Sequence, residues 1–182
     1  NDLTSYMNYN GLRKGDGDFD YVSIGDVNRN GLIDVYDISC VTTELDGGVR
    51  NSSDKVAGSL VLTPNKRTYA AGDMLQVTVS GKGLHYVNGL SFALPYSTDE
   101  LEFVGTDLID MKEMVNLTYD RLHSNGQKAL YPTFVNRGNN FLLEEGDHDL
   151  FVLKFRAKKA GKFNLHAIDG LLVDRNLGVV AF

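Results

Sequence analysis

The sequence has no tryptophan, three prolines and a single cysteine among its 182 residues. The lone cysteine, Cys40, excludes a disulfide within the chain and any metal site built from several thiolates. No apolar run approaches the roughly 20 residues that a membrane-spanning helix needs. Acidic side chains outnumber basic ones, and the net charge of -6 argues against nucleic acid or an anionic membrane surface as a partner. We therefore expect a globular protein with neither kind of partner.

Side chains that carry oxygen recur at alternate positions in one short stretch. They are Asp26, Asn28, Asn30, Asp34 and Asp37, with the backbone carbonyl of Leu32 between them. This spacing is that of a 12-residue calcium loop, in which positions 1, 3, 5, 7, 9 and 12 supply the ligands. Position 6 needs a residue that tolerates a positive φ, and Gly31 stands there. The sequence therefore predicts a Ca²⁺ site, closed at position 12 by an aspartate in place of the usual glutamate.

A metal-free alternative also fits this stretch, because Asp and Asn favour turns and helix N-caps without any ion. A turn needs one or two such residues, whereas five stand here around one glycine. Without a cation, the three carboxylates of the loop would repel one another. A second group, Asp16, Asp18 and Asp20, is a further candidate for an ion, but it lacks the glycine and the closing acid.

From Val35 the apolar residues recur at spacings of three and four, which predicts a helix that stops at Gly47 and Gly48. The main apolar face consists of Val35, Ile38, Val41, Thr42 and Leu45. A second, weaker face consists of Tyr36, Cys40 and Thr43, and we expect it to lie against the domain that follows. Residues 1–50 then form a small module, 51–57 a linker and 58–182 a second domain.

From residue 59 the period of the pattern changes to two. Leu75, Val77 and Val79 alternate with polar residues, and the later segments repeat this pattern. Turns such as Asn88-Gly89 and Asn125-Gly126 separate the segments. Many short strands with regular turns predict a mainly β chain whose second domain is a β-sandwich.

Two resemblances to known families follow from these motifs. The residues of the calcium loop, together with Ile33, resemble a dockerin repeat, in which a calcium loop is followed by one exiting helix. Only one loop is intact, and Asn8, Asn10 and Gly11 look like the remains of a first loop with a tyrosine at position 1.

Residues 57–182 look like a cohesin domain. The resemblance rests on Gly72-Asp73 before a valine-rich strand, on the stretch 96–104, and on Leu153-Lys154-Phe155 followed by residues 158–161. It implies a nine-stranded jelly-roll β-sandwich. Cohesins are also similar in fold to some carbohydrate-binding modules, which keeps a sugar open as the alternative ligand.

Together the two resemblances imply a non-catalytic accessory or C-terminal region of a secreted, periplasmic or cell-surface bacterial protein that degrades polysaccharide. Its partner would be another protein, or the two modules would dock on one another. For the alternative role of a carbohydrate-binding module, Tyr86 and Tyr119 are the candidate stacking residues.

We find no nucleophile motif, phosphate-binding loop or zinc spacing, and we do not expect an enzyme. The densest polar cluster, Glu144, Glu145, Asp147, His148 and Asp149, reads as a solvated loop rather than as a pair of glycosidic carboxylates.

Overall fold

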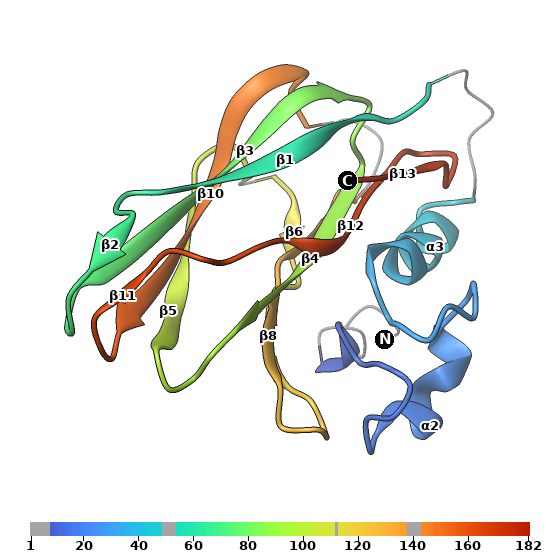
Figure 1. Cartoon of the computed structure of the whole chain (residues 1–182). Coiled ribbons are helices and arrows are strands. Elements are labelled where there is room, and N and C mark those ends of the chain that lie inside the picture. The colour runs from blue at the N-terminus through green and yellow to red at the C-terminus, as the bar shows by residue number, and fades with distance from the viewer. Residues whose placement is uncertain (1–7, 49–53, 112, 138–142) are drawn as a thin grey trace.

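The computed structural model of this chain describes residues 8–48, 54–111, 113–137 and 143–182. Two antiparallel sheets face each other, and a small helical segment at the N-terminus lies beside one of them (Figure 1). None of the described helices is long and apolar enough to cross a membrane.

The first sheet has four strands and contains the most regular part of the chain. Its order is β1 (Ala57–Pro64), β3 (Met74–His85), β10 (Gly146–Ala157) and β5 (Leu101–Leu108). Val79 lies opposite Leu62 of β1 and opposite Phe151 of β10. The inward side chains of β3 are buried, while Gln76 between them is exposed. The period-two pattern of the sequence is therefore realised as one buried and one wet face.

The second sheet has seven strands, several of them short. Its main path is β13 (Val179–Ala181), β12 (Ile168–Val173), β4 (Gly89–Tyr96), β8 (Lys128–Tyr131) and β7 (Tyr119–Leu122). Strand β9 (Thr133–Val135) pairs with β4 and with β6 (Val115–Asn116), and a separate small sheet joins β2 (Thr68–Tyr69) to β11 (Gly161–Lys162). The described residues thus form thirteen strands rather than the predicted nine, because many pieces are only two or three residues long.

The main core fills the space between the two sheets. Phe92, Phe134, Phe151 and Phe155 are its largest buried side chains. The rings of Phe134 and Phe151 lie 4.8 Å apart between centroids and join strands of opposite sheets. A sandwich closed by aromatic contacts of this kind confirms the mainly β class that the alternating pattern predicts.

Strand β4 departs from the alternating pattern because almost every one of its residues is buried. Leu90, Phe92 and Leu94 point into the main core. Ser91 and Ala93 point the other way: the Ser91 hydroxyl accepts from the Val35 N–H, and Ala93 belongs to a small apolar cluster against which Leu32 packs. This segment therefore covers the outer face of the second sheet.

The N-terminal segment contains α2 (Phe19–Val22), a 3₁₀ turn η1 (Ser23–Gly25) and α3 (Val35–Leu45). Helix α3 ends just before Gly47 and Gly48, whose φ angles are 102° and 97°. Residues 11–14 run antiparallel to residues 31–33. The Ile33 N–H donates to the Leu12 carbonyl at 2.9 Å, and the Gly11 N–H donates to the Ile33 carbonyl at 2.8 Å.

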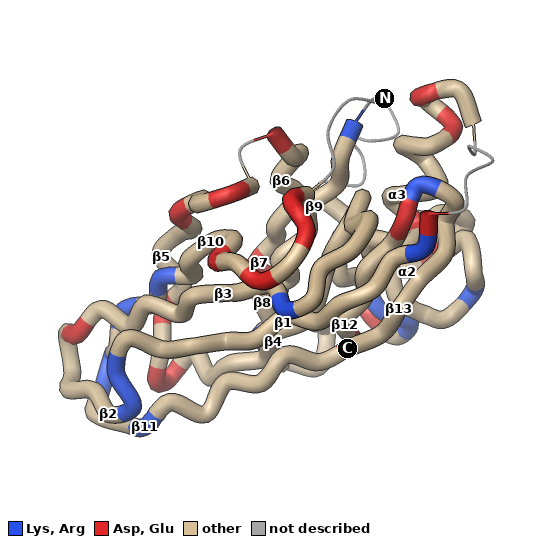
Figure 2. The backbone as a smooth tube through the Cα atoms, turned by 90° about the horizontal axis from the view of Figure 1, so that it is seen from above, with Lys and Arg blue, Asp and Glu red and all other residues tan. Residues whose placement is uncertain are grey.

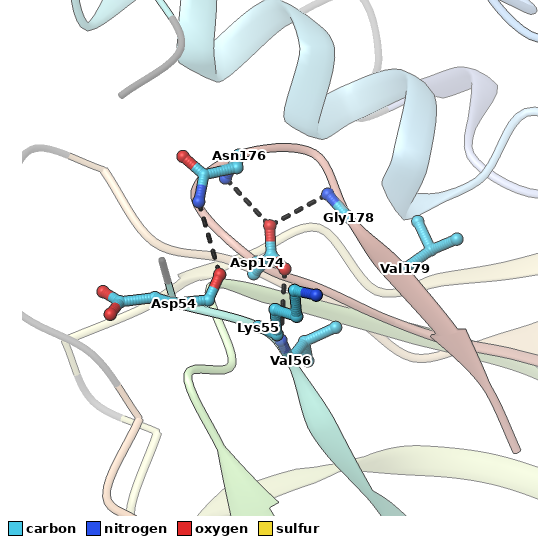
Figure 3. Close-up of a pocket in the computed structure, with 7 residues that line it drawn as sticks. All are labelled: Asp54, Lys55, Val56, Asp174, Asn176, Gly178 and Val179. Carbon is cyan, nitrogen blue, oxygen red and sulfur yellow. Dashed lines mark hydrogen bonds between the residues drawn. The ribbon is translucent and has the colours of Figure 1, made fainter. Parts of the chain in front are cut away.

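Asp174 ties the start of the sandwich to its last hairpin (Figure 3). One carboxylate oxygen accepts from the N–H groups of Asn176 and Gly178, both at 2.9 Å. The other oxygen accepts from the Val56 N–H at 3.1 Å. These residues line an open pocket of about 380 Å³, in which the Asp174 carboxylate is already engaged by three backbone donors.

Gly11 gives a test of how closely the N-terminal segment approaches the sheet. Its φ is +83°, and a Cβ placed on it would overlap the ring of Tyr131. We expect Gly11→Ala to lower the free energy of unfolding by about 1–3 kcal/mol more than Gly15→Ala does, because it adds overpacking to the same backbone strain. Gly15 is the matched control, since its φ is +104° and nothing lies within 4 Å of its Cβ position. Equal losses in urea unfolding would show that the ring of Tyr131 does not press on Gly11.

Candidate functional site

Five of the six predicted calcium ligands lie in the loop that leads into α3, and the sixth, Asp37, lies in the first turn of that helix. The Asp26 carboxylate accepts hydrogen bonds from the N–H groups of Asn30 at 3.2 Å and Gly31 at 2.8 Å. Arg29 and Gly31 have positive φ angles of 56° and 82°, and these wrap the backbone around that carboxylate. Gly31 at position 6 is therefore favoured by its positive φ and not by a lack of space, because a Cβ there would meet nothing closer than 3.6 Å.

Asp34 and Asp37 close the other end of the loop. Asp37 accepts from the N–H groups of Val27 at 2.8 Å and Asp34 at 3.0 Å, so it links both ends of the loop. The Asp34 carboxylate accepts from the Tyr36 N–H at 3.0 Å and caps helix α3. The helix cap of the metal-free alternative is therefore present in the fold, and it occupies only part of the oxygen atoms in the loop.

Three negatively charged side chains of this stretch are buried without a positively charged partner among the described residues. Asp26, Asp34 and Asp37 are 6%, 5% and 0% exposed, and no lysine or arginine among the described residues forms an ion pair with them. Burial, together with the neighbouring charges of Asp34 and Asp26, raises the pKa of Asp37 to about 7 although backbone hydrogen bonds oppose the shift. Burial also raises the pKa of Asp34. A divalent cation would remove this conflict, because it stabilises the ionised form of all three groups.

The donor set fits calcium in chemistry, since it offers oxygen alone. Asn28 and Asn30 are exposed beside the buried carboxylates and complete the set with the backbone of Leu32. The carboxylates of Asp26, Asp34 and Asp37 are not gathered closely enough for one oxygen of each to lie within 4.8 Å of the other two.

The loop and α3 are docked on the sandwich through a second apolar core. Its buried members are Leu12, Phe19, Ile33, Val35, Ile38, Leu117, Val135 and Val173, which come from both parts of the chain. The Val35 N–H donates to the Ser91 hydroxyl at 3.3 Å. A Cβ on Gly89 would meet Val35 and Ser39 at 3.0 Å, so glycine permits the close approach of α3 to β4.

The helix face that meets the sheet differs from the predicted one. The sequence predicts Tyr36, Cys40 and Thr43 against the second domain, whereas Val35 and Ile38 lie in the shared core. Tyr36, Cys40 and Thr43 are half-buried. The prediction is wrong because it assigns the stronger apolar face to the small N-terminal segment, which has too few residues to cover it.

Polar contacts around this second core join residues 8 and 10 to the sandwich. Asn10 is 1% exposed, and its amide donates to the Leu117 carbonyl at 2.9 Å and to the Thr133 hydroxyl at 2.6 Å. Arg121 donates to the backbone carbonyls of Asn10 at 3.0 Å and Asn8 at 2.6 Å. Sequence reasoning missed Arg121 entirely, since nothing in its strand distinguishes it from a surface arginine.

A row of three side chains joins the same surfaces, of which His123 and Tyr131 are buried and Asp16 is half-buried. His123 Nδ1 lies 2.7 Å from the Asp16 carboxylate, and His123 Nε2 lies 2.6 Å from the Tyr131 hydroxyl. Burial raises the pKa of Asp16, but hydrogen bonds from the N–H groups of Ser124 and Arg13 and from His123 hold it below its ordinary value. Asp16 is thus engaged by protein donors, while Asp18 and Asp20 are exposed, so the structure does not gather residues 16–20 into a second ion site.

Both candidate sugar-stacking tyrosines contact other side chains of the chain. The Arg121 guanidinium lies 4.3 Å from the centroid of the Tyr119 ring and covers one of its faces. Tyr86 is half-buried, with its ring 4.2 Å from that of His85. Sugar binding stays a prediction that rests on the sequence.

The raised pKa of Asp37 predicts a pH dependence. Because its pKa is about 7 in the folded state and 3.8 in the reference state, the folded protein binds an extra proton between these values. In metal-free buffer the free energy of unfolding should therefore fall as pH rises from about 4 to 7 and level off above 7. Urea melts of the wild type and Asp37→Asn across this range test the idea. An equally steep fall in the variant would contradict it, and saturating calcium should remove the fall in the wild type.

We expect the replacement of Arg121 to lower the free energy of unfolding markedly, because this side chain joins the N-terminal segment to the sandwich. Arg121→Ala leaves the carbonyls of Asn8 and Asn10 without their donor, and we expect a loss of about 2–3 kcal/mol in the free energy of unfolding. Arg156→Ala, an exposed arginine on β10, is the control and should change it by less than about 0.5 kcal/mol. Similar losses in both variants would show that the Arg121 bonds do not support docking.

Comparison with known proteins gives a fold but no sequence family. No protein-family model matches the sequence, and no curated protein matches it. A type I cohesin–dockerin complex from Clostridium thermocellum is similar in structure, with a TM-score of 0.52, 12% identity, and coverage of 72% of this chain and 91% of that one.

Two further cohesin structures have TM-scores of 0.49. One comes from Archaeoglobus fulgidus, at 17% identity over 67% of this chain and 83% of that one. The other is a module of a family 33 glycoside hydrolase of Clostridium perfringens, at 12% identity over 70% of this chain and 95% of that one. The match to the Clostridium thermocellum complex shows that the sandwich of this chain has a cohesin-like fold.

Proposed function

We propose that this chain is a non-catalytic, calcium-stabilised attachment unit, in which a dockerin-like segment docks within the same chain on a cohesin-like sandwich. The observation that carries the proposal is the burial of β4 on both faces, with one face in the main core and the other under the N-terminal segment. The similar structure from Clostridium thermocellum is a cohesin in complex with a dockerin. Here a helix and a calcium-type loop cover one face of a sandwich of the same fold.

The pairing of two loops supports the dockerin-like assignment of residues 8–48. Residues 11–14 and 31–33 exchange backbone hydrogen bonds, as expected if an intact loop lies beside the remains of a second one. Gly11 keeps a positive φ at the position that corresponds to Gly31. The first loop has lost its metal-ligand pattern, and its Asn10 bonds the sandwich instead. The intact loop then binds the ion, and the other loop contacts the sandwich.

The biological setting follows from the same assignment. Modules of this kind attach or space the parts of secreted bacterial proteins that degrade polysaccharide, and we propose that role outside the cell for this chain. Weak calcium sites fill there, which suits a loop that uses aspartate at its last position. The calcium ion would be structural, because its ligands lead directly into helix α3 and the docked face of that helix.

A thermal melt of the full chain in calcium and in chelator tests this proposal. At a hundred times its dissociation constant, calcium should stabilise the folded state by about 2.7 kcal/mol. Because the segment and the sandwich share a buried core, we expect one transition that moves to higher temperature with calcium.

The double variant Asp26→Asn, Asp34→Asn removes two loop charges and should abolish the calcium shift without removing the transition. Asp99→Asn, an exposed aspartate outside the loop, is the matched control and should keep the full shift. No shift in the wild type would remove the calcium site. Two transitions, of which only one responds, would overturn docking within the chain.

A further inference from the structure

A mixed cluster of nitrogen and oxygen donors lies at the end of the sandwich where β5 leaves the first sheet and β10 enters it. Acidic residues gather near these strand ends, away from the basic residues at β2 and β11 (Figure 2). Asp110, Glu144 and His148 each place one ligand atom so that all three atoms lie within 4.8 Å of one another. They form the one such group among the described residues, and none of them belongs to the calcium loop.

The backbone under this cluster is fixed by the sheet. The Asp110 N–H donates to the Leu150 carbonyl at 3.0 Å, and the Ile109 N–H donates to the same carbonyl at 2.8 Å. His148 lies in β10, paired with Gly81 of β3. His148 is thus held on a strand, and Asp110 is held by backbone hydrogen bonds just after the neighbouring strand β5, which limits the movement needed to close around an ion.

The imidazole of His148 is oriented by the backbone. Its Nε2 lies 2.6 Å from the Glu144 carbonyl, an acceptor, so this nitrogen carries the proton of the neutral ring. Nδ1 then presents a lone pair on the side of the Glu144 carboxylate, 3.9 Å away, which is too long for a hydrogen bond. Metal-binding histidines commonly donate their second ring nitrogen to a backbone carbonyl in this way.

The other charged groups of this region already have partners. Asp147 accepts from the Gly83 N–H at 2.7 Å, Asp149 accepts from the Ser80 hydroxyl at 2.6 Å, and Glu145 lies 3.0 Å from His85. No hydrogen bond to the carboxylate of Asp110 or Glu144 is present among the described residues, and no lysine or arginine there pairs with either group. Two carboxylates and an imidazole lone pair therefore face one another without a cation.

We propose that Asp110, Glu144 and His148 bind a divalent first-row transition-metal ion, represented by Zn²⁺. The imidazole nitrogen selects against Ca²⁺ and Mg²⁺, which prefer oxygen alone. One nitrogen and two carboxylate oxygens suit zinc at about 2.0–2.2 Å, with water in the fourth position. The ion joins the exit of β5 to the start of β10. This site is independent of calcium and of the proposed docking.

Zinc titration of the full chain, kept in saturating calcium, tests the proposal. Isothermal calorimetry with zinc chloride should show one zinc ion per chain, and the melting temperature should rise with zinc. His148→Ala and Asp110→Asn should each weaken binding by at least about tenfold, since each removes a direct ligand. Cobalt(II) in place of zinc should give visible absorption bands that His148→Ala abolishes.

Two further histidine variants make the outcome specific. His166→Ala changes an exposed histidine outside the cluster and should leave zinc binding unchanged. His85→Ala removes the neighbouring histidine that pairs with Glu145 and should also leave it unchanged. Absence of zinc binding to the wild type, binding that survives His148→Ala, or binding lost in His85→Ala would each overturn the assignment. Circular dichroism in calcium confirms that each variant is folded.

Discussion

The apolar contact between α3 and the outer face of β4 is the interaction on which the arrangement of this chain depends. Without it, Val35 and Ile38 would face water, and the outer face of the second sheet would be open beside Leu117, Val135 and Val173. Each such side chain contributes about 1.5–3 kcal/mol when it is fully buried. The other buried apolar residues of the N-terminal segment, Leu12, Phe19 and Ile33, belong to the same core, so the order of the segment derives from the sandwich.

Two acidic groups of this segment, one half-buried and one fully buried, are stabilised in opposite ways. Asp16 is held by protein donors, including His123, and its pKa is low. Asp37 receives two backbone N–H groups but sits beside two further carboxylates, and its pKa is high. The first arrangement is complete with protein atoms alone, whereas the second favours a proton or a cation. The proposed calcium ion therefore acts where the protein has not supplied a counter-charge.

Much of this fold was accessible from the sequence, because period-two patterns and glycine turns report directly on strands. The tight turn that precedes α3 was equally accessible, since the spacing of its Asp and Asn residues and Gly31 are local features. The docking surface was not. Arg121 in β7 and His123 just after it look like surface residues, and the N-terminal groups that they contact lie more than 100 positions away in the chain. One usable signal was present in β4, whose unbroken apolar and small residues indicate a strand covered on both faces.

The docking of α3 also determines how tightly any other protein must bind to occupy this face of the sandwich. Residues 48 and 54 bound a short connection, so the helix and the sheet stay together even when their contact opens briefly. Short linkers between two binding modules give effective concentrations in the millimolar range. A free competitor at micromolar concentration must therefore bind about a thousand times more tightly than α3 does to hold half of the sites. The outer face of the second sheet is therefore already occupied by α3 of the same chain.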